Sequence, residues 1–104
     1  MADRRYAEII EHLNGIGHVW EGGQDICKVQ YHIEVLQDRI KLTSFGISRI
    51  DGFKRIRGIV TPIGKSIHEI FGKTLTLVFE NGKKLDFFVS STSTGSINAR
   101  GLIY

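Results

Sequence analysis

The sequence predicts a mainly β fold, a small antiparallel β-barrel, and three observations lead to this class. Residues 74–90 form two alternating runs of β-branched, aromatic and leucine side chains around Asn81-Gly82, the pattern of a β-hairpin. Residues 27–35 alternate in the same way. The 104 residues include 12 glycines and one proline, which suits strands joined by tight turns. Strands with one apolar face bury that face most easily when their sheet curls into a barrel.

The loop of the predicted hairpin can have two or three residues, and the apolar pattern separates the two cases. A two-residue loop at Asn81-Gly82 places Leu77 opposite Asp86, so both faces of the ribbon mix apolar and charged side chains. A three-residue loop at 80–82, with its glycine in the left-handed conformation of a bulge, places Leu77 opposite Leu85. We expect the three-residue loop because it gives the sheet one apolar face.

This register also distinguishes two adjacent phenylalanines. Phe87 lies opposite Leu75 on the apolar face, whereas Phe88 lies on the other face, because neighbours along a strand point to opposite sides. We expect Phe87 to be buried in the core. Phe88 should be partly exposed, or covered by the N-terminal helix or a partner.

The N-terminal residues predict a short amphipathic helix. Between residues 3 and 13, four apolar side chains follow the i, i+3, i+4, i+7 spacing of one helix face, with Asp3 as N-cap and Asn14-Gly15 as the stop. These side chains are Tyr6, Ile9, Ile10 and Leu13. A helix of three turns is marginal alone, so it must pack on the barrel or on another chain.

The rest of the chain reads as strands with one further short helix. We expect strands at 16–20, 27–35, 40–45, 53–61 and 97–104, with a turn at 37–39. Ser66 and Glu69 have the spacing of a capping box, which predicts a two-turn helix that ends at Gly72. Its apolar face would consist of Ile67, Ile70 and Phe71.

These elements describe one domain, residues 1–104, with the N-terminal helix in 1–14 and the barrel in 16–104. From residue 27 onward the order is three strands, a short helix and two strands, which is similar to the element order of an OB-fold. The OB-like order is a likeness of element order alone and implies no function.

Composition limits the classes of function only loosely. The net charge is +3, from 14 basic and 11 acidic residues, which permits an anionic partner without requiring one. No stretch is long or apolar enough to cross a membrane, and we expect no membrane partner. The single cysteine, Cys27, cannot form an internal disulfide, which favours a cytoplasmic protein.

The residues that most often carry chemistry show no catalytic or metal-binding spacing. Cys27 alternates with inward-facing residues and is expected to be a small core side chain. Gly64-Lys65-Ser66 is similar to the end of a phosphate-binding loop, but Ile59 occupies the position of the required first glycine. The four histidines have no ligand spacing; they are His12, His18, His32 and His68. We therefore expect no enzyme activity, no metal and no cofactor.

One constellation has the composition of a binding surface. In the predicted strand 53–61, alternation places Phe53, Arg55 and Arg57 on one face, where an unpaired base could stack while guanidinium groups hold phosphates. Arg49 and Lys54 complete this candidate nucleic-acid site. The competing interpretation is a solvated strand face on which arginine stems cover the phenylalanine.

Two hypotheses about function follow from these observations, and a third stays open. The first is a non-catalytic β-barrel interaction module, of unknown role, that binds a protein partner or a second copy of itself through a sheet edge or face. The alternative is a single-stranded nucleic-acid-binding domain of OB-like form. A small-molecule-binding barrel or weak enzyme would rest only on the fact that barrels have interiors.

Overall fold

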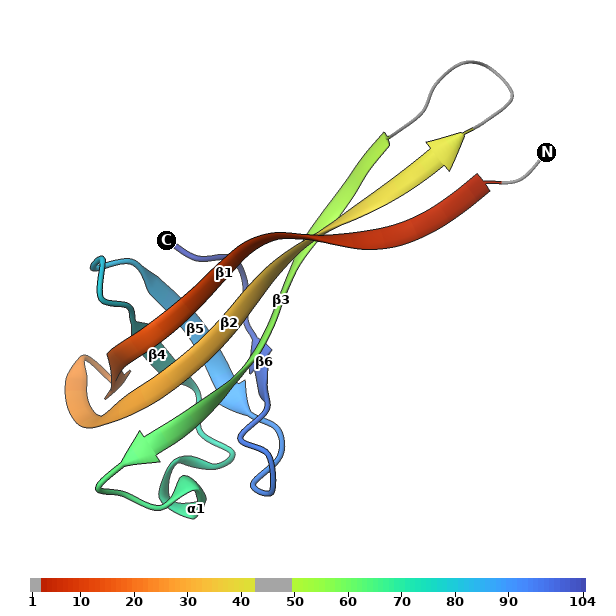
Figure 1. The fold of residues 1–104 in the computed structure, drawn as a ribbon. Coiled ribbons are helices and arrows are strands. Elements are labelled where there is room, and N and C mark those ends of the chain that lie inside the picture. The colour runs from red at the N-terminus through yellow and green to blue at the C-terminus, as the bar shows by residue number, and fades with distance from the viewer. Residues whose placement is uncertain (1–2, 43–49) are drawn as a thin grey trace.

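The computed structural model describes the backbone of residues 3–42 and 50–104 and the side chains of residues 7–39 and 53–104. The described elements, in chain order, are β1 (Asp3–Glu21), β2 (Gln24–Leu42), β3 (Ile50–Ile63), α1 (Ile67–Ile70), β4 (Leu75–Val78), β5 (Lys84–Val89) and β6 (Ile97–Ala99). All strand pairs are antiparallel, in the order β3-β2-β1-β4-β5-β6 (Figure 1). A single bridge, Ile59 to Ser96, brings the two ends of the sheet together. The predicted mainly β antiparallel barrel is therefore confirmed, as a nearly closed one.

The three longest strands extend well beyond the barrel. Figure 1 shows β1, β2 and β3 continuing together as a twisted three-stranded ribbon that leaves the barrel on one side. We call this ribbon the arm and define it as residues 3–12, 34–42 and 50–57, where His12 pairs with Glu34 and Glu34 with Arg57. The molecule is correspondingly elongated, with Cα extents of 54 × 27 × 21 Å.

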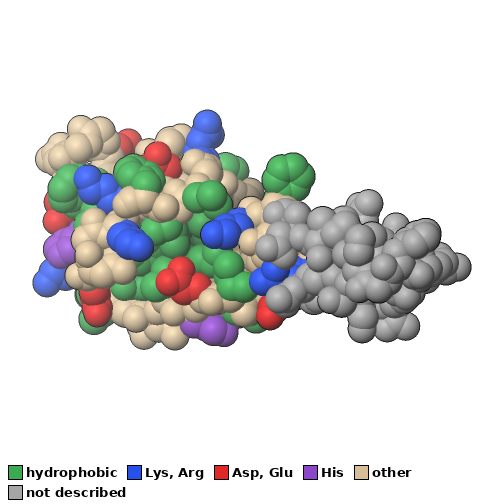
Figure 2. All heavy atoms as spheres, turned by 90° about the horizontal axis from the view of Figure 1, so that it is seen from above, with side chains coloured by type: hydrophobic (Ala, Val, Ile, Leu, Met, Phe, Trp, Pro, Cys, Tyr) green, Lys and Arg blue, Asp and Glu red, His purple; other side chains and the backbone are tan. Residues whose placement is uncertain are grey.

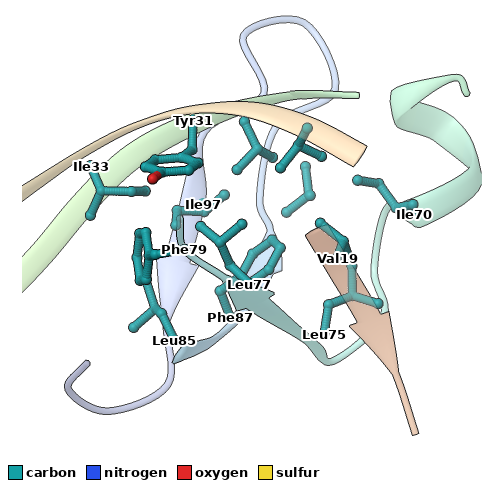
Figure 3. Packing of buried hydrophobic residues seen from close by; sticks show 13 residues of the cluster. Val19, Tyr31, Ile33, Ile70, Leu75, Leu77, Phe79, Leu85, Phe87 and Ile97 are labelled. Atoms are coloured by element: carbon teal, nitrogen blue, oxygen red, sulfur yellow. The ribbon is translucent and has the colours of Figure 1, made fainter. Parts of the chain in front are cut away.

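The core lies inside the barrel and is contributed by every described strand and by α1. Its buried members are Val19, Val29, Tyr31, Ile33, Val60, Ile70, Leu75, Leu77, Phe79, Leu85, Phe87, Val89 and Ile97. Figure 3 shows them converging from the surrounding elements. Tyr31 meets Phe79 edge to face, with ring centroids 5.0 Å apart, and its hydroxyl oxygen accepts a hydrogen bond from the Glu80 backbone N–H at 3.3 Å. A buried hydroxyl thus has a partner, as burial requires.

The hairpin of β4 and β5 has the predicted register. Leu77 pairs with Leu85 and Leu75 with Phe87, and the Phe79 N–H donates to the Lys83 carbonyl at 2.8 Å. The loop is therefore Glu80-Asn81-Gly82, and its glycine has φ 84°, the left-handed conformation expected of the bulge. Phe87 is fully buried and Phe88 is partly exposed, as the register requires.

The capping-box prediction is also confirmed. Ser66 is the N-cap of α1: its Oγ accepts from the His68 N–H at 3.2 Å, and the Glu69 carboxylate accepts from the Ser66 N–H at 2.7 Å. Ile70 is fully buried beneath the barrel wall. Phe71, expected on the same buried face, is instead 48% exposed, because the helix ends at Ile70 and the extended backbone of Phe71 turns its ring outward.

The predicted N-terminal helix is wrong, because residues 3–13 are the first half of strand β1. The backbone of this segment pairs with β2 from Asp3 to Glu21, with a register shift between Ile9 and Glu11. That bulge places an extra residue, Ile10, in the strand and breaks the alternation, so the apolar spacing imitates a helix. A 19-residue partner strand offers hydrogen bonds along its whole length, which three isolated helical turns cannot match.

The predicted turn at 37–39 is also wrong. β2 runs through it to Leu42, and Gln37 pairs with Glu8 on one side and Lys54 on the other. The extra residue lies in β3, where the register shifts opposite Gln37 and Arg39. Part of the strand predicted at 40–45 lies outside the described residues.

The last predicted strand, 97–104, is a strand only from Ile97 to Ala99. Beyond it the chain still follows β5, because the Arg100 N–H donates to the Asp86 carbonyl at 2.7 Å and the Tyr104 N–H to the Lys84 carbonyl at 2.8 Å. Gly101 has φ 116°, and the detour it permits interrupts the regular ladder.

Candidate functional site

The predicted nucleic-acid site lies on the outer surface of the arm, near its junction with the barrel. Phe53, Arg55 and Arg57 are alternate residues of β3 and all are exposed, with Phe53 84% exposed. Lys54 points to the opposite face of the same strand. Arg49 lies outside the described residues.

Both described arginines of this site are paired with carboxylates from β2. The Arg57 Nε donates to Glu34 Oε1 at 2.8 Å, and an Arg55 Nη2 lies 2.9 Å from Asp38 Oδ1. Glu34 is also 3.6 Å from the His12 ring. These contacts leave the guanidinium groups less available to a phosphate than an open basic groove would.

The described side chains of the arm are electrically balanced. The acidic ones are Glu8, Glu11, Glu34 and Asp38, and the basic ones are Arg39, Lys54, Arg55 and Arg57. The face shown in Figure 2 likewise has lysine or arginine and carboxylate side chains interspersed among hydrophobic ones. Nucleic-acid binding surfaces instead concentrate positive charge on one face or stripe.

Three further basic residues could have extended the site, and the described part of the chain does not bring them to it. Lys28 pairs with Ile63, at the opposite end of β3. The Arg39 side chain forms an ion pair with Glu8. It also lies on the opposite face of β2 from its neighbour Asp38, which is the residue that contacts Arg55. The side chain of Lys41 lies outside the described residues.

A second feature, which we call the free edge of β1, is the side of residues 7–17 that faces away from β2. β1 pairs with β4 only at His18, Val19 and Trp20. At the end of this edge that adjoins β4, the Ile16 N–H donates to Glu80 Oε1 at 2.9 Å. Alternate residues of an antiparallel strand direct their backbone groups to the same side, so Asn14 and His12 direct theirs to this edge, where the described residues supply no backbone partner.

The apolar pattern of residues 3–13 does not predict a strand with a free edge, because Ile9 and Ile10 fit the spacing of a helix as well as that of a bulged strand. The signal that could reveal it is Gly22-Gly23. Both glycines have positive φ, 59° and 82°, the requirement of a two-residue hairpin turn. Such a turn makes the two flanking segments each other's strand partners.

A third feature, which we call the seam, separates β3 from β6 and the segment that follows it. The Val60 N–H donates across it to the Gly95 carbonyl at 2.9 Å, next to the Ile59–Ser96 bridge. By the same alternation, Ile56 and Lys54 direct their N–H and C=O groups into the seam, where the described residues offer no backbone partner.

The opposite wall of the seam is also an open edge. The Arg100 N–H points to β5, so the backbone groups of Ala99 point away from β5 and toward β3. Between the two walls lies an open hollow of about 570 Å³. Its lining residues are Phe53, Lys54, Arg55, Ile56, Asn98, Ala99, Gly101 and Leu102.

The residues with chemical potential form no catalytic arrangement in the described part of the chain. Cys27 is half-buried against the core, and burial raises the pKa of its thiol, which disfavours the nucleophilic thiolate. Among the described residues, no three histidine, cysteine or acidic side chains gather as a metal site. The described helix is too short to span a bilayer.

Comparison with known proteins finds no match among protein-family models, curated proteins or solved structures.

Proposed function

We propose that this chain is a non-catalytic β-barrel interaction module that binds a protein partner, or a second copy of itself, through the strand edges of its arm. The observation that carries this proposal is that both outer strands, β1 and β3, have backbone edges without a partner in the described residues. Long unpaired edges are costly for a protein to leave open, because they pair readily with other chains. Strand addition to such an edge is a recurrent mode of protein recognition.

Surface composition supports a protein partner over a nucleic acid. The arm has exposed apolar side chains near its edges, Ile9 at 40%, Ile10 at 42% and Phe53 at 84%. Its described charges are of both signs and largely paired. A mixed surface with a few large apolar groups is typical of protein interfaces. The unpaired cysteine favours a cytoplasmic setting.

The free edge of β1 provides a direct test with a matched control. His12→Pro removes an N–H that faces the edge rather than β2, so the ladder within the arm is kept while strand addition is blocked. His12→Ala removes the same side chain but keeps the N–H. Affinity capture from lysate and light scattering of the purified full chain compare both variants with the wild type.

We expect a partner, or a dimer, that is retained by His12→Ala and lost by His12→Pro. A strictly monomeric protein whose captured proteins are the same for all three forms would contradict the proposal. If His12→Pro still binds the partner and an alteration of β3 abolishes binding, the interaction lies on the β3 edge instead.

The second candidate is a single-stranded nucleic-acid-binding domain of OB-like form. It is supported by the position of α1 between the third and fourth strands and by the exposed ring of Phe53 on the same face as Arg55. Titration of a labelled oligonucleotide at two salt concentrations tests it, since phosphate contacts make affinity fall steeply with salt. Absence of binding at low salt eliminates it.

A further inference from the structure

The end of the barrel from which the arm leaves carries three charged side chains around a hollow. Figure 1 shows the C-terminus and the loop between β4 and β5 at this end, and α1 at the opposite end. Here the inward-facing positions change from apolar to charged, at Glu11 of β1, Lys54 of β3 and Lys83 immediately before β5. We call the hollow between these three side chains the mouth. It is the open end of the barrel interior, where a ligand can reach the edge of the core.

The floor of the mouth is apolar. It consists of Leu13, Val35, Ile56 and Ile103, of which Val35 is buried and the other three pack against the core cluster. The hollow has a volume of about 160 Å³, close to that of a protein cavity that holds a benzene ring. This volume fits one aromatic or branched aliphatic side chain. It is too small for an extended chain, so the mouth suits a small molecule or a single residue.

The charged side chains of the mouth are not paired. Each described arginine of the arm forms an ion pair with a carboxylate. Glu11, Lys54 and Lys83 form none with any described residue. The strands of Glu11 and Lys54 are about 10 Å apart, because β2 lies between them and neighbouring strands are about 5 Å apart. Charges of both signs thus face one hollow without neutralising each other.

The loop that carries Lys83 is held in place by hydrogen bonds. The Lys83 N–H donates to Asn81 Oδ1 at 2.9 Å, and the Ile16 N–H of β1 donates to Glu80 Oε1 at 2.9 Å. Gly15 leaves room for this carboxylate, since a Cβ there would lie 2.6 Å from Oε1. The wall with Lys83 is therefore fixed to the strand that carries the opposite charge, and a site with fixed walls binds at lower entropic cost.

Only a zwitterion complements both signs of charge in the mouth. A ligand with a carboxylate alone would place an anion beside Glu11, and a ligand with an ammonium group alone would place a cation beside two lysines. Like charges brought together in this way cost affinity. An α-amino acid carries both charged groups on one carbon, from which its side chain diverges. That arrangement matches a hollow with a charged rim and an apolar floor.

We propose that the mouth binds a free α-amino acid with a large apolar side chain, of the size of phenylalanine. The side chain lies on the floor, the α-ammonium group faces Glu11, and the α-carboxylate faces Lys83 and Lys54. This site goes beyond the proposed function and does not depend on it, because a ligand in the mouth leaves the free edge of β1 open.

The test is a titration of the full chain with L-phenylalanine at neutral pH, followed by two-dimensional amide NMR spectra. Saturable shifts should cluster at the amides of Leu13, Ile56, Lys83 and Ile103. L-Alanine should bind at least about tenfold more weakly, because it lacks the buried side chain. N-acetyl-L-phenylalanine, which lacks the ammonium group, and L-phenylalaninamide, which lacks the carboxylate, should each bind about fivefold or more weakly.

Variants of the charged rim give crossed predictions. Glu11→Gln should weaken binding of phenylalanine but not of N-acetyl-phenylalanine, and Lys83→Gln should weaken binding of phenylalanine but not of phenylalaninamide. Lys83 is the better choice because Lys54 also lines the hollow of the seam. Lys28→Gln, on the outer face of β2 opposite Ile63, is the matched control and should leave binding unchanged. All three positions are exposed, and the amide spectra show whether each variant is folded.

The remaining outcomes overturn the inference. If phenylalanine, leucine and tryptophan all fail to give saturable shifts, the three charges are only a solvated rim. Equal binding of N-acetyl-phenylalanine and phenylalanine would mean that the mouth accepts the C-terminal residue of a peptide instead of a free amino acid. Equal binding of phenylalaninamide would indicate an N-terminal residue. None of these results bears on the interaction-module proposal, which the His12 variants test separately.

Discussion

The barrel and the arm share strands β1, β2 and β3, yet they differ in what stabilises them. In the barrel, inward side chains such as Leu77, Phe87 and Val19 are fully buried. In the arm, Phe53 is 84% exposed and Ile10 42% exposed. The barrel is stabilised by a core, whereas the arm depends on its backbone ladder and on ion pairs between strands.

This difference shows that strand pairing can continue past the hydrophobic core of the barrel. Three strands are near the minimum for a stable sheet, and one without a covering layer has little apolar burial to add. Val35, Leu36 and Gln37, at 7%, 6% and 6% exposed, supply the local burial that the described part of the arm has. We expect the arm to open locally at much lower cost than the barrel unfolds, which suits a surface that another chain completes.

The largest expected effect is the loss of a barrel core side chain. Phe87→Ala should destabilise the protein by about 3–5 kcal/mol, because it leaves a cavity among fully buried neighbours. Phe88→Ala is the matched control, since the adjacent ring is partly exposed and should cost clearly less. Chemical denaturation measures both free energies of unfolding. Equal large losses would mean that both faces of β5 are buried and that the one-sided description of the barrel is wrong.

The second effect concerns closure of the barrel next to the seam. Gly95 has φ 74°, and a Cβ there would lie 2.3 Å from the Val60 carbonyl oxygen. Gly95→Ala should therefore cost about 2–4 kcal/mol, from the left-handed conformation and from displacement of the loop from β3. Faster hydrogen exchange at the Val60 amide should accompany this loss.

Gly64→Ala is the control for closure. Gly64 has a similar φ of 76°, but a Cβ there meets nothing within 4 Å. Its substitution should cost only the conformational term, about 1–2 kcal/mol, and leave Val60 exchange unchanged. Equal costs for both glycines would show that contact between β3 and the loop before β6 contributes little to the barrel.

Ion pairs on the arm should contribute far less than core burial in the barrel. The side chains of Arg57 and Glu34 are 62% and 28% exposed. A double-mutant cycle with Arg57→Ala and Glu34→Ala should give a coupling of about 0.2–1 kcal/mol that falls as salt is added. A salt-insensitive coupling of about 2 kcal/mol or more would show that this ion pair, rather than the backbone ladder, holds β3 against β2 in the arm.

The smallest effect concerns the last residues, which follow β5. The Tyr104 hydroxyl donates to Asp86 Oδ1 at 2.9 Å, and this hydrogen bond, followed by desolvation and the carboxylate charge, raises the pKa of Tyr104. The folded state then holds the proton more tightly than the unfolded state. The resulting stability is complete below the ordinary tyrosine pKa and is lost as pH rises through the raised one.

Ultraviolet titration, with Tyr104→Phe subtracted, reports this group alone. Asp86→Asn removes the negative charge and should return the Tyr104 pKa toward its ordinary value. An unchanged titration in Asp86→Asn would mean that the carboxylate does not hold the C-terminal segment against β5.

Local patterns in the sequence determined the elements whose partners are close in the chain. The register of β4 and β5 follows from Leu77 and Leu85, which belong on the same apolar face. It also follows from the positive φ at position 82 of the loop, which glycine adopts readily. The cap of α1 follows from Ser66 and Glu69, three residues apart. In each case the competing arrangements differ within a few residues, so local chemistry is enough to choose between them.

Tertiary structure decided the elements whose partners are distant. Residues 3–13 carry a helical spacing but become a strand, because β2 offers a partner along their whole length and the bulge at Ile10 absorbs the mismatch. Phe53, Arg55 and Arg57 do lie on one face of β3, yet the charge balance of that face depends on Glu34 and Asp38 from β2. The free edge and the seam depend on which strands end early and which continue. Such edges are set by pairing across the whole sheet, and no stretch of sequence carries that information alone.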